Sequence, residues 1–124
     1  MSATTPERGR PGGATLAVEE IADAAVLRFG GELDLQTVPE LQARVSAAVA
    51  ATGGAVVADL TAVRFLSSSG LTLLLGLRSA LAEEDRPLRV VVGGSKAVSR
   101  PLEITGLDRL LDVHPDLDAA LAAC

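Results

Sequence analysis

Three consecutive serines between an apolar run and a leucine-rich run constrain this chain more than any other feature. The segment from Asp59 to Leu77 reads DLTAVRFLSSSGLTLLLGL, and it predicts a strand, a short loop and a helix in that order. The serines would then lie at the amino end of the helix, where backbone N–H groups are unpaired and carry partial positive charge. An anionic group attached to a serine would be stabilised there, and phosphoserine is such a group.

Composition indicates one domain with an aliphatic core. The chain has 124 residues, of which 48% are hydrophobic, but it contains only two Phe and neither Trp nor Tyr. This length is enough to bury a core without disulfides or metals. The formal net charge is −5. That charge and the shortage of aromatic rings argue against nucleic acid as a partner, because phosphate backbones attract cations and single strands stack on aromatic rings.

The two ends of the chain are predicted to contribute little to the fold or to function. Residues 1–13 mix Pro, Gly, Thr and Arg without periodicity, so we expect a disordered tail and a domain over residues 14–124. The single cysteine, Cys124, is the last residue, so no intramolecular disulfide is expected and nothing indicates an oxidising compartment. The N-terminus lacks the apolar core of a signal peptide, and the leucine run is too short to span a bilayer. We therefore expect a cytoplasmic protein with no membrane association.

The remainder of the chain alternates between strand and helix patterns, which predicts an α/β fold. TLAVEEI and AAVLRF read as a hairpin that ends at Gly30-Gly31, and a helix follows with Thr37 as N-cap and Glu40 completing a capping box. The runs AVVADL, LRVVV and LLDV read as further strands, and helical patterns cover residues 71–81, 99–105 and 116–123. We expect a mixed, mostly parallel sheet of four to five strands with about four helices.

The residues that carry chemistry favour a binding protein over an enzyme. Serine is a weak nucleophile without a base, and the only histidine, His114, is distant in sequence and reads as a loop residue. One His and one Cys do not make a typical metal site, and no cofactor is indicated. The patterns GxSxG, GxGxxG and GxxxxGK[ST] are absent. Glycine pairs at strand ends, such as Gly93-Gly94, keep a small enzyme or nucleotide-binding protein as a weaker alternative.

Three motifs occur in order from about Ala14 onward. They are GELD, which ends at Asp34 and is followed by Thr37, then DLTAVRFLSSSGL, then VSRPLEITGLDRLLDV. Together they resemble the anti-sigma factor antagonists of bacteria, whose STAS domain is shared with the cytoplasmic tails of sulphate transporters. The resemblance implies a STAS-like fold and a partner switch. In that family the unphosphorylated protein binds an anti-sigma factor and frees a sigma factor, and the anti-sigma factor is an ATP-dependent kinase that phosphorylates and releases it.

The same resemblance maps the phosphoacceptor onto Ser68. The family pattern is Asp-Ser-Ser-Gly or Asp-Ser-Thr-Gly, and its first hydroxyl residue is phosphorylated, whereas this chain has Ser67 in place of the Asp. We expect the partner to contact a set of neighbouring residues: Asp34, Ser67, Ser69, Gly70 and Leu71. Two structural alternatives stay open, namely that Ser68 is only a helix N-cap and that Asp34 only hydrogen-bonds its own turn.

The expected partner is an anti-sigma factor serine kinase, with its ATP as the phosphoryl donor, and a serine phosphatase that resets the switch is kept open. The leucines at 71–77 cover more than one helical stripe, so some apolar surface is predicted to remain for that partner. Ser67 in place of Asp leaves an alternative open. In it, the same domain is a non-phosphorylated scaffold or an accessory subunit of a signalling or lipid-transport complex.

Overall fold

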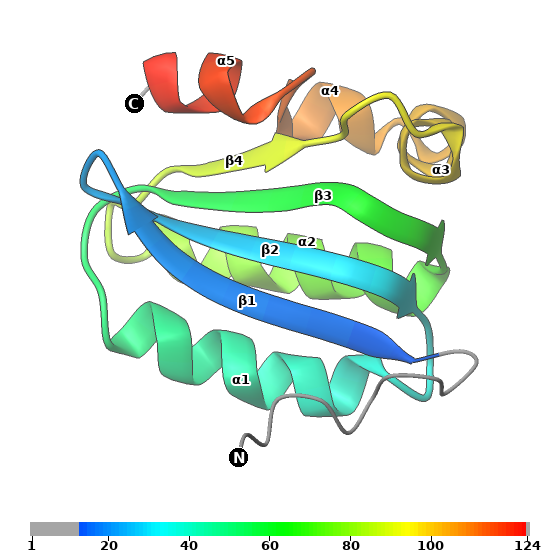
Figure 1. Ribbon diagram of the computed structural model, residues 1–124, viewed down its shortest axis with the longest axis horizontal. Coiled ribbons are helices and arrows are strands. Elements are labelled where there is room, and N and C mark those ends of the chain that lie inside the picture. Colours follow the sequence, from blue (N-terminus) through cyan, green and yellow to red (C-terminus); the bar gives the residue numbers. More distant parts are fainter. Residues whose placement is uncertain (1–12, 124) are drawn as a thin grey trace.

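Five strands form one mixed sheet in which each strand lies beside its neighbours in sequence (Figure 1). The computed structural model describes residues 13–123, so most of the predicted tail and Cys124 lie outside it. The first pair of strands is antiparallel and the other pairs are parallel, as predicted. No helix in the described part has the length and hydrophobicity to cross a membrane. The elements are β1 (Ala14–Ile21), β2 (Ala24–Leu33), α1 (Val38–Ala50), β3 (Val56–Leu66), α2 (Ser68–Ala82), β4 (Leu88–Val91), α3 (Lys96–Thr105), α4 (Leu107–Leu110), β5 (Asp112–His114) and α5 (Leu117–Ala122).

Helices cover both faces of the sheet. α1 and α2 lie on one face, and α5 lies across the other (Figure 1). Val38, Leu41 and Val45 of α1 are buried, as their helical spacing predicts. On the second face, Ala120 of α5 packs with Val57 of β3 in a smaller apolar cluster. The aliphatic core expected from the composition therefore lies mainly between the sheet and the pair α1 and α2.

The two central strands run further than the apolar pattern predicts. The runs AAVLRF and AVVADL end β2 at Gly30-Gly31 and β3 at Leu60. These predictions are wrong, because both strands continue until Leu33 and Leu66 are partners in the sheet. Irregularities in the register before and after the glycine pair absorb the extra residues of β3. The segments that follow the two strands therefore begin side by side.

Two local assignments also differ from the sequence analysis. α3 begins at Lys96 and not at Ser99, because the Ser95 side chain caps it by accepting a backbone hydrogen bond from the first turn. Its predicted C-cap, Gly106, is confirmed by a left-handed φ of 77°. His114, expected in a loop, lies in β5. α4 brings the number of helices among the described residues to five.

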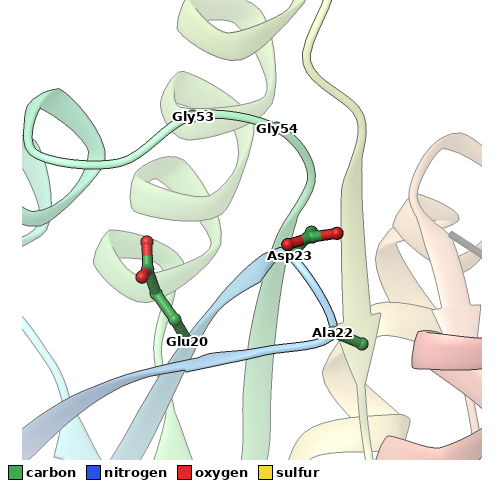
Figure 2. Close-up of a pocket in the computed structure, with 5 residues that line it drawn as sticks. All are labelled: Glu20, Ala22, Asp23, Gly53 and Gly54. Carbon is green, nitrogen blue, oxygen red and sulfur yellow. The ribbon is translucent and has the colours of Figure 1, made fainter.

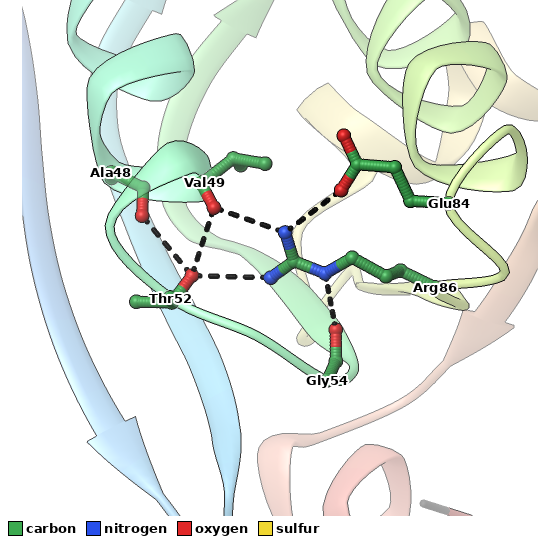
Figure 3. Close-up of polar contacts among 6 residues, drawn as sticks. All are labelled: Ala48, Val49, Thr52, Gly54, Glu84 and Arg86. Carbon is green, nitrogen blue, oxygen red and sulfur yellow. Dashed lines mark hydrogen bonds and ion pairs between the residues drawn. The ribbon is translucent and has the colours of Figure 1, made fainter.

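A buried arginine that the sequence analysis does not single out ties the end of α1 to the start of β3 (Figure 3). The Arg86 guanidinium donates to the carbonyl oxygens of Gly54 at 2.7 Å and Val49 at 3.0 Å, and to the Thr52 hydroxyl at 3.1 Å. The nitrogen that donates to Val49 also forms an ion pair of 3.5 Å with Glu84. A cation is favourable at the carboxyl end of α1, where carbonyl groups lack helical partners. Arg86 therefore links the chain segments at the end of the sheet that lies opposite the three consecutive serines.

Candidate functional site

Ser67 joins the amino end of α2 to the end of β2. Its backbone N–H and its hydroxyl both donate to the carbonyl oxygen of Leu33, at 3.0 Å and 2.8 Å. The same hydroxyl oxygen accepts from the N–H of Ser69 at 3.2 Å. Ser67, in an extended conformation, is therefore the N-cap of α2. The interpretation of Ser68 as the N-cap is wrong, because α2 already begins at Ser68, one residue earlier than that interpretation requires.

Ser68 is the first residue of α2, and its side chain is exposed. Its backbone carbonyl accepts a hydrogen bond from the Thr72 hydroxyl at 2.9 Å, so the first turn of the helix is well ordered around it. Ser69, the next residue, is half-buried. Of the three serines, Ser68 therefore presents its hydroxyl most openly to another protein.

The turn between β2 and α1 is built by Asp34 and Thr37. Asp34 Oδ1 accepts from the N–H groups of Gln36 at 3.0 Å and Thr37 at 3.1 Å. In return, Thr37 Oγ1 accepts from the Asp34 N–H at 3.0 Å and donates to the Glu32 carbonyl at 2.7 Å. The predicted capping box between Thr37 and Glu40 is wrong, because Thr37 is N-cap without a side-chain capping bond. The hydrogen bonds expected of Asp34 within its own turn are confirmed.

Gly70 and Leu71 lie beneath the site and not on its surface. Both are buried, and Leu71 is 8% exposed. A Cβ atom added to Gly70 would lie 2.6 Å from Leu66 Cδ1 and 3.0 Å from Leu33 Cβ, so only glycine lets α2 approach the two strand ends this closely. These two residues hold the serine loop in place from below.

Exposed apolar surface at the site comes from residues other than the helix leucines. The leucines of α2 are mostly buried, namely Leu71, Leu73, Leu74 and Leu77, and Leu75 is half-buried. Leu35, in the turn after β2, is instead 77% exposed, and Phe65, near the end of β3, is 50% exposed. Leu35 is not among the predicted site residues, although a leucine between two polar turn residues is itself a signal of an exposed apolar side chain.

A wider hollow at the opposite end of the sheet is a poor candidate for chemistry (Figure 2). It has a volume of about 560 Å³ and is lined by Glu20, Ala22, Asp23, Gly53 and Gly54. Figure 2 shows that the two carboxylates do not converge on one point. Within the described part of the chain, no group of three or more His, Cys, Asp and Glu side chains is placed to hold a metal ion. The candidate site is therefore the serine end of the sheet.

Comparison with known proteins agrees with this fold and with the family resemblance of the sequence. The family model of the STAS domain matches residues 15–120. An anti-sigma factor antagonist from Mycobacterium paratuberculosis has a crystal structure that matches with a TM-score of 0.82 and 36% identity, over 98% of this chain and 97% of that one. RsfB of Mycobacterium tuberculosis, an anti-sigma-F factor antagonist, is 35% identical over 111 residues, covering 90% of this chain and 89% of RsfB. The phosphorylated form of SpoIIAA from Bacillus shares the fold, with a TM-score of 0.65 and 20% identity over 89% of this chain and 100% of that one.

The chain therefore belongs to the STAS domain family. Within that family it is similar to anti-sigma factor antagonists, at 35–36% identity over most of the chain.

Proposed function

We propose that this protein is an anti-sigma factor antagonist that is switched by phosphorylation of Ser68. The observation that carries the proposal is the exposed Ser68 at the first position of α2, next to a serine whose hydroxyl is held by two hydrogen bonds. Two relatives with about a third of their residues identical are named anti-sigma factor antagonists, which supports the first half of the proposal. In its unphosphorylated form the protein binds an anti-sigma factor and thereby frees a sigma factor.

The geometry favours Ser68 over its two neighbours as the acceptor. The Ser67 hydroxyl donates its proton to Leu33 and accepts from Ser69, so phosphorylation there would break a contact that holds α2 to β2. Ser69 is half-buried between α1 and α2, where a kinase has less room. Ser68 can be modified without loss of either contact.

Local electrostatics allow the domain to carry the phosphate without refolding. A phosphoserine adds about −1.5 to −2 charges. α2 spans 15 residues and has no acidic residue in its first turn. The partial positive charge at its amino end can therefore stabilise a phosphate on Ser68 without being neutralised by a carboxylate of that turn. With Ser67 in place of an aspartate, no carboxylate stands directly beside the acceptor. The phosphate is therefore tolerated by the protein and acts on the partner.

The partner contact is proposed to surround Ser68. Leu35 and Phe65 supply exposed apolar surface on the two neighbouring segments, and Asp34 adds a carboxylate. Ser67 and Ser69 border this surface, while Gly70 and Leu71 support it from below. A phosphate placed in such a contact opposes binding by desolvation and by repulsion from acidic groups of the partner.

Catalysis in this system is assigned to the partners. The anti-sigma factor is proposed to be a serine kinase that transfers the phosphoryl group from its own ATP to Ser68, and a serine phosphatase to reset the switch. The antagonist itself is proposed to be a non-enzymatic, cytoplasmic binding protein without a cofactor.

Site-resolved mass spectrometry after incubation with ATP and a candidate anti-sigma factor kinase tests the proposal. The expected result is one phosphate on Ser68 of the wild-type protein and none in Ser68→Ala, with unmodified Ser67 and Ser69. A kinase that is active on another substrate but leaves the chain unmodified would contradict it. That result would favour the non-phosphorylated scaffold.

A further inference from the structure

A groove runs between α1 and α2 on the outer side of the helical layer. Its volume is about 200 Å³. Its floor is formed by apolar side chains that are less than 10% exposed, namely Val38, Val45, Leu73 and Leu77. Its rim consists of small or polar residues that are exposed, among them Ser46 and Gly76. The groove is therefore lower and more apolar than the surface on either side of it.

The groove carries no charge although both helices do. None of its ten lining residues is charged, whereas Glu40 and Arg44 of α1 and Arg78 of α2 are exposed nearby in sequence. Depletion of charged residues distinguishes the centre of a protein interface from ordinary surface. The volume is below the roughly 300–1,000 Å³ of pockets that hold small-molecule ligands. Both features favour aliphatic side chains of another protein as the occupant.

The groove is continuous with the phosphorylation site. α1 and α2 both follow the carboxyl ends of parallel strands, so their amino ends lie at the same end of the sheet. Val38 and Ser69, at these amino ends, both line the groove. Ser68 lies one turn before Thr72, another lining residue, whose hydroxyl donates to the Ser68 carbonyl at 2.9 Å, so a phosphate on Ser68 would stand beside the amino end of the groove.

We propose that this groove is a second part of the contact with the anti-sigma factor and receives aliphatic side chains of that partner. The inference rests on the proposed function. A phosphate at Ser68 would affect both parts of the contact, because it places a charge at the end of an otherwise neutral groove. Desolvation of that charge would then weaken binding along the whole groove.

A second copy of this chain fits the groove less well than a different protein does. A two-fold symmetric dimer places the same surface on both sides of the interface. The rim of this groove offers small and polar residues, such as Gly76, Ala80 and Ser46, and no large apolar side chain that would enter the groove of the other copy. Two grooves facing each other would leave both unfilled.

Gly76 allows the groove to be filled without disturbing the fold. A Cβ atom added at this position meets nothing within 4 Å, and glycine is the least favourable ordinary residue inside a helix after proline. Gly76→Leu should therefore keep or raise the melting temperature while its side chain occupies the groove. Ser79→Leu adds similar bulk to the exposed surface of the same helix, outside the groove lining, and is the matched control. Ser46→Leu fills the groove from α1 as a second test.

The measurement is the Kd for the anti-sigma factor kinase that phosphorylates the wild-type chain, by calorimetric titration of the unphosphorylated full chain without ATP. We expect Gly76→Leu and Ser46→Leu to weaken binding at least about tenfold and Ser79→Leu to stay within about twofold of the wild-type Kd.

Wild-type affinity in either folded groove variant would overturn the groove contact and leave the proposed function intact. A wild-type dimer that Gly76→Leu dissociates, with unchanged affinity for the kinase, would assign the groove to a second copy and overturn it too. Absence of any binding by the wild-type chain would instead contradict the proposed function.

Discussion

The Ser67 hydroxyl donates to the Leu33 carbonyl oxygen at 2.8 Å and so connects segments that are 34 residues apart. The same hydroxyl accepts from the Ser69 N–H, so it acts as donor and acceptor at once. A carboxylate in this position accepts hydrogen bonds only. The serine that stands in place of the family's aspartate therefore makes one contact that an aspartate cannot make.

Replacing Ser67 should weaken the fold at the site. Ser67→Ala removes the helix cap and the bond to Leu33, and we expect the free energy of unfolding in urea to fall by about 1–2 kcal/mol. Ser67→Asp keeps the cap and loses only the bond to Leu33, so it should cost about 1 kcal/mol. Ser68→Ala is the control and should change stability by less than about 0.5 kcal/mol. Equal unfolding midpoints for Ser67→Ala and the wild type would contradict this account of the loop.

Two glycines of the same helix should respond to alanine in opposite directions. Gly70→Ala places a methyl group 2.6 Å from Leu66 Cδ1, and we expect a loss of about 1–3 kcal/mol from overpacking. Gly76→Ala meets open space and should gain about 0.5–1 kcal/mol from the higher helix propensity of alanine. Thermal unfolding followed by circular dichroism separates the two variants. A common direction of change would mean that α2 is placed differently against the strand ends.

Arg86→Met should be among the most damaging single substitutions outside the apolar core. It removes the guanidinium donors of the Gly54 and Val49 carbonyl groups and of the Thr52 hydroxyl, at an expected cost of about 2–4 kcal/mol. Arg78→Met, on the exposed surface of α2, should cost less than about 0.5 kcal/mol. Chemical denaturation of both variants provides the comparison. A small effect at Arg86 would show that water replaces its contacts easily.

Asp34 allows the structural and partner-contact roles to be separated. Asp34→Asn retains the side-chain oxygen that accepts from Gln36 and Thr37, so stability should stay within about 0.5 kcal/mol of the wild type. Asp34→Ala loses these bonds and should cost about 1 kcal/mol. If the carboxylate also contacts the partner, both variants bind the kinase more weakly, as titration would show. Full binding by Asp34→Asn would reduce Asp34 to its role in the turn.

The order of elements was predictable because local patterns determine it. Alternation, helical spacing and glycine pairs predicted the hairpin, the parallel strands and the leucine helix. The length of β3 was not predictable in the same way. Exposed residues after Leu60, such as Thr61 and Arg64, interrupt the apolar pattern, so the apolar run AVVADL ends before the strand does.

Details of the site depended on contacts between distant segments or on competition between neighbours. Thr37 has two acidic residues at capping distance, Asp34 before it and Glu40 after it, and the structure pairs it with Asp34. The Ser67 cap depends on the position of Leu33, and Arg86 binds residues 32 to 37 positions away. Local patterns carry no information about such pairs.

The most direct test of the central claim compares the affinity for one anti-sigma factor kinase before and after stoichiometric phosphorylation of this protein at Ser68. We expect tight binding of the unphosphorylated chain, a loss of at least about a hundredfold on phosphorylation, and an unchanged circular dichroism spectrum, because the helix end accepts the charge and the partner surface does not. Equal affinity of the two forms would contradict the account, since Ser68 would then not be a switch.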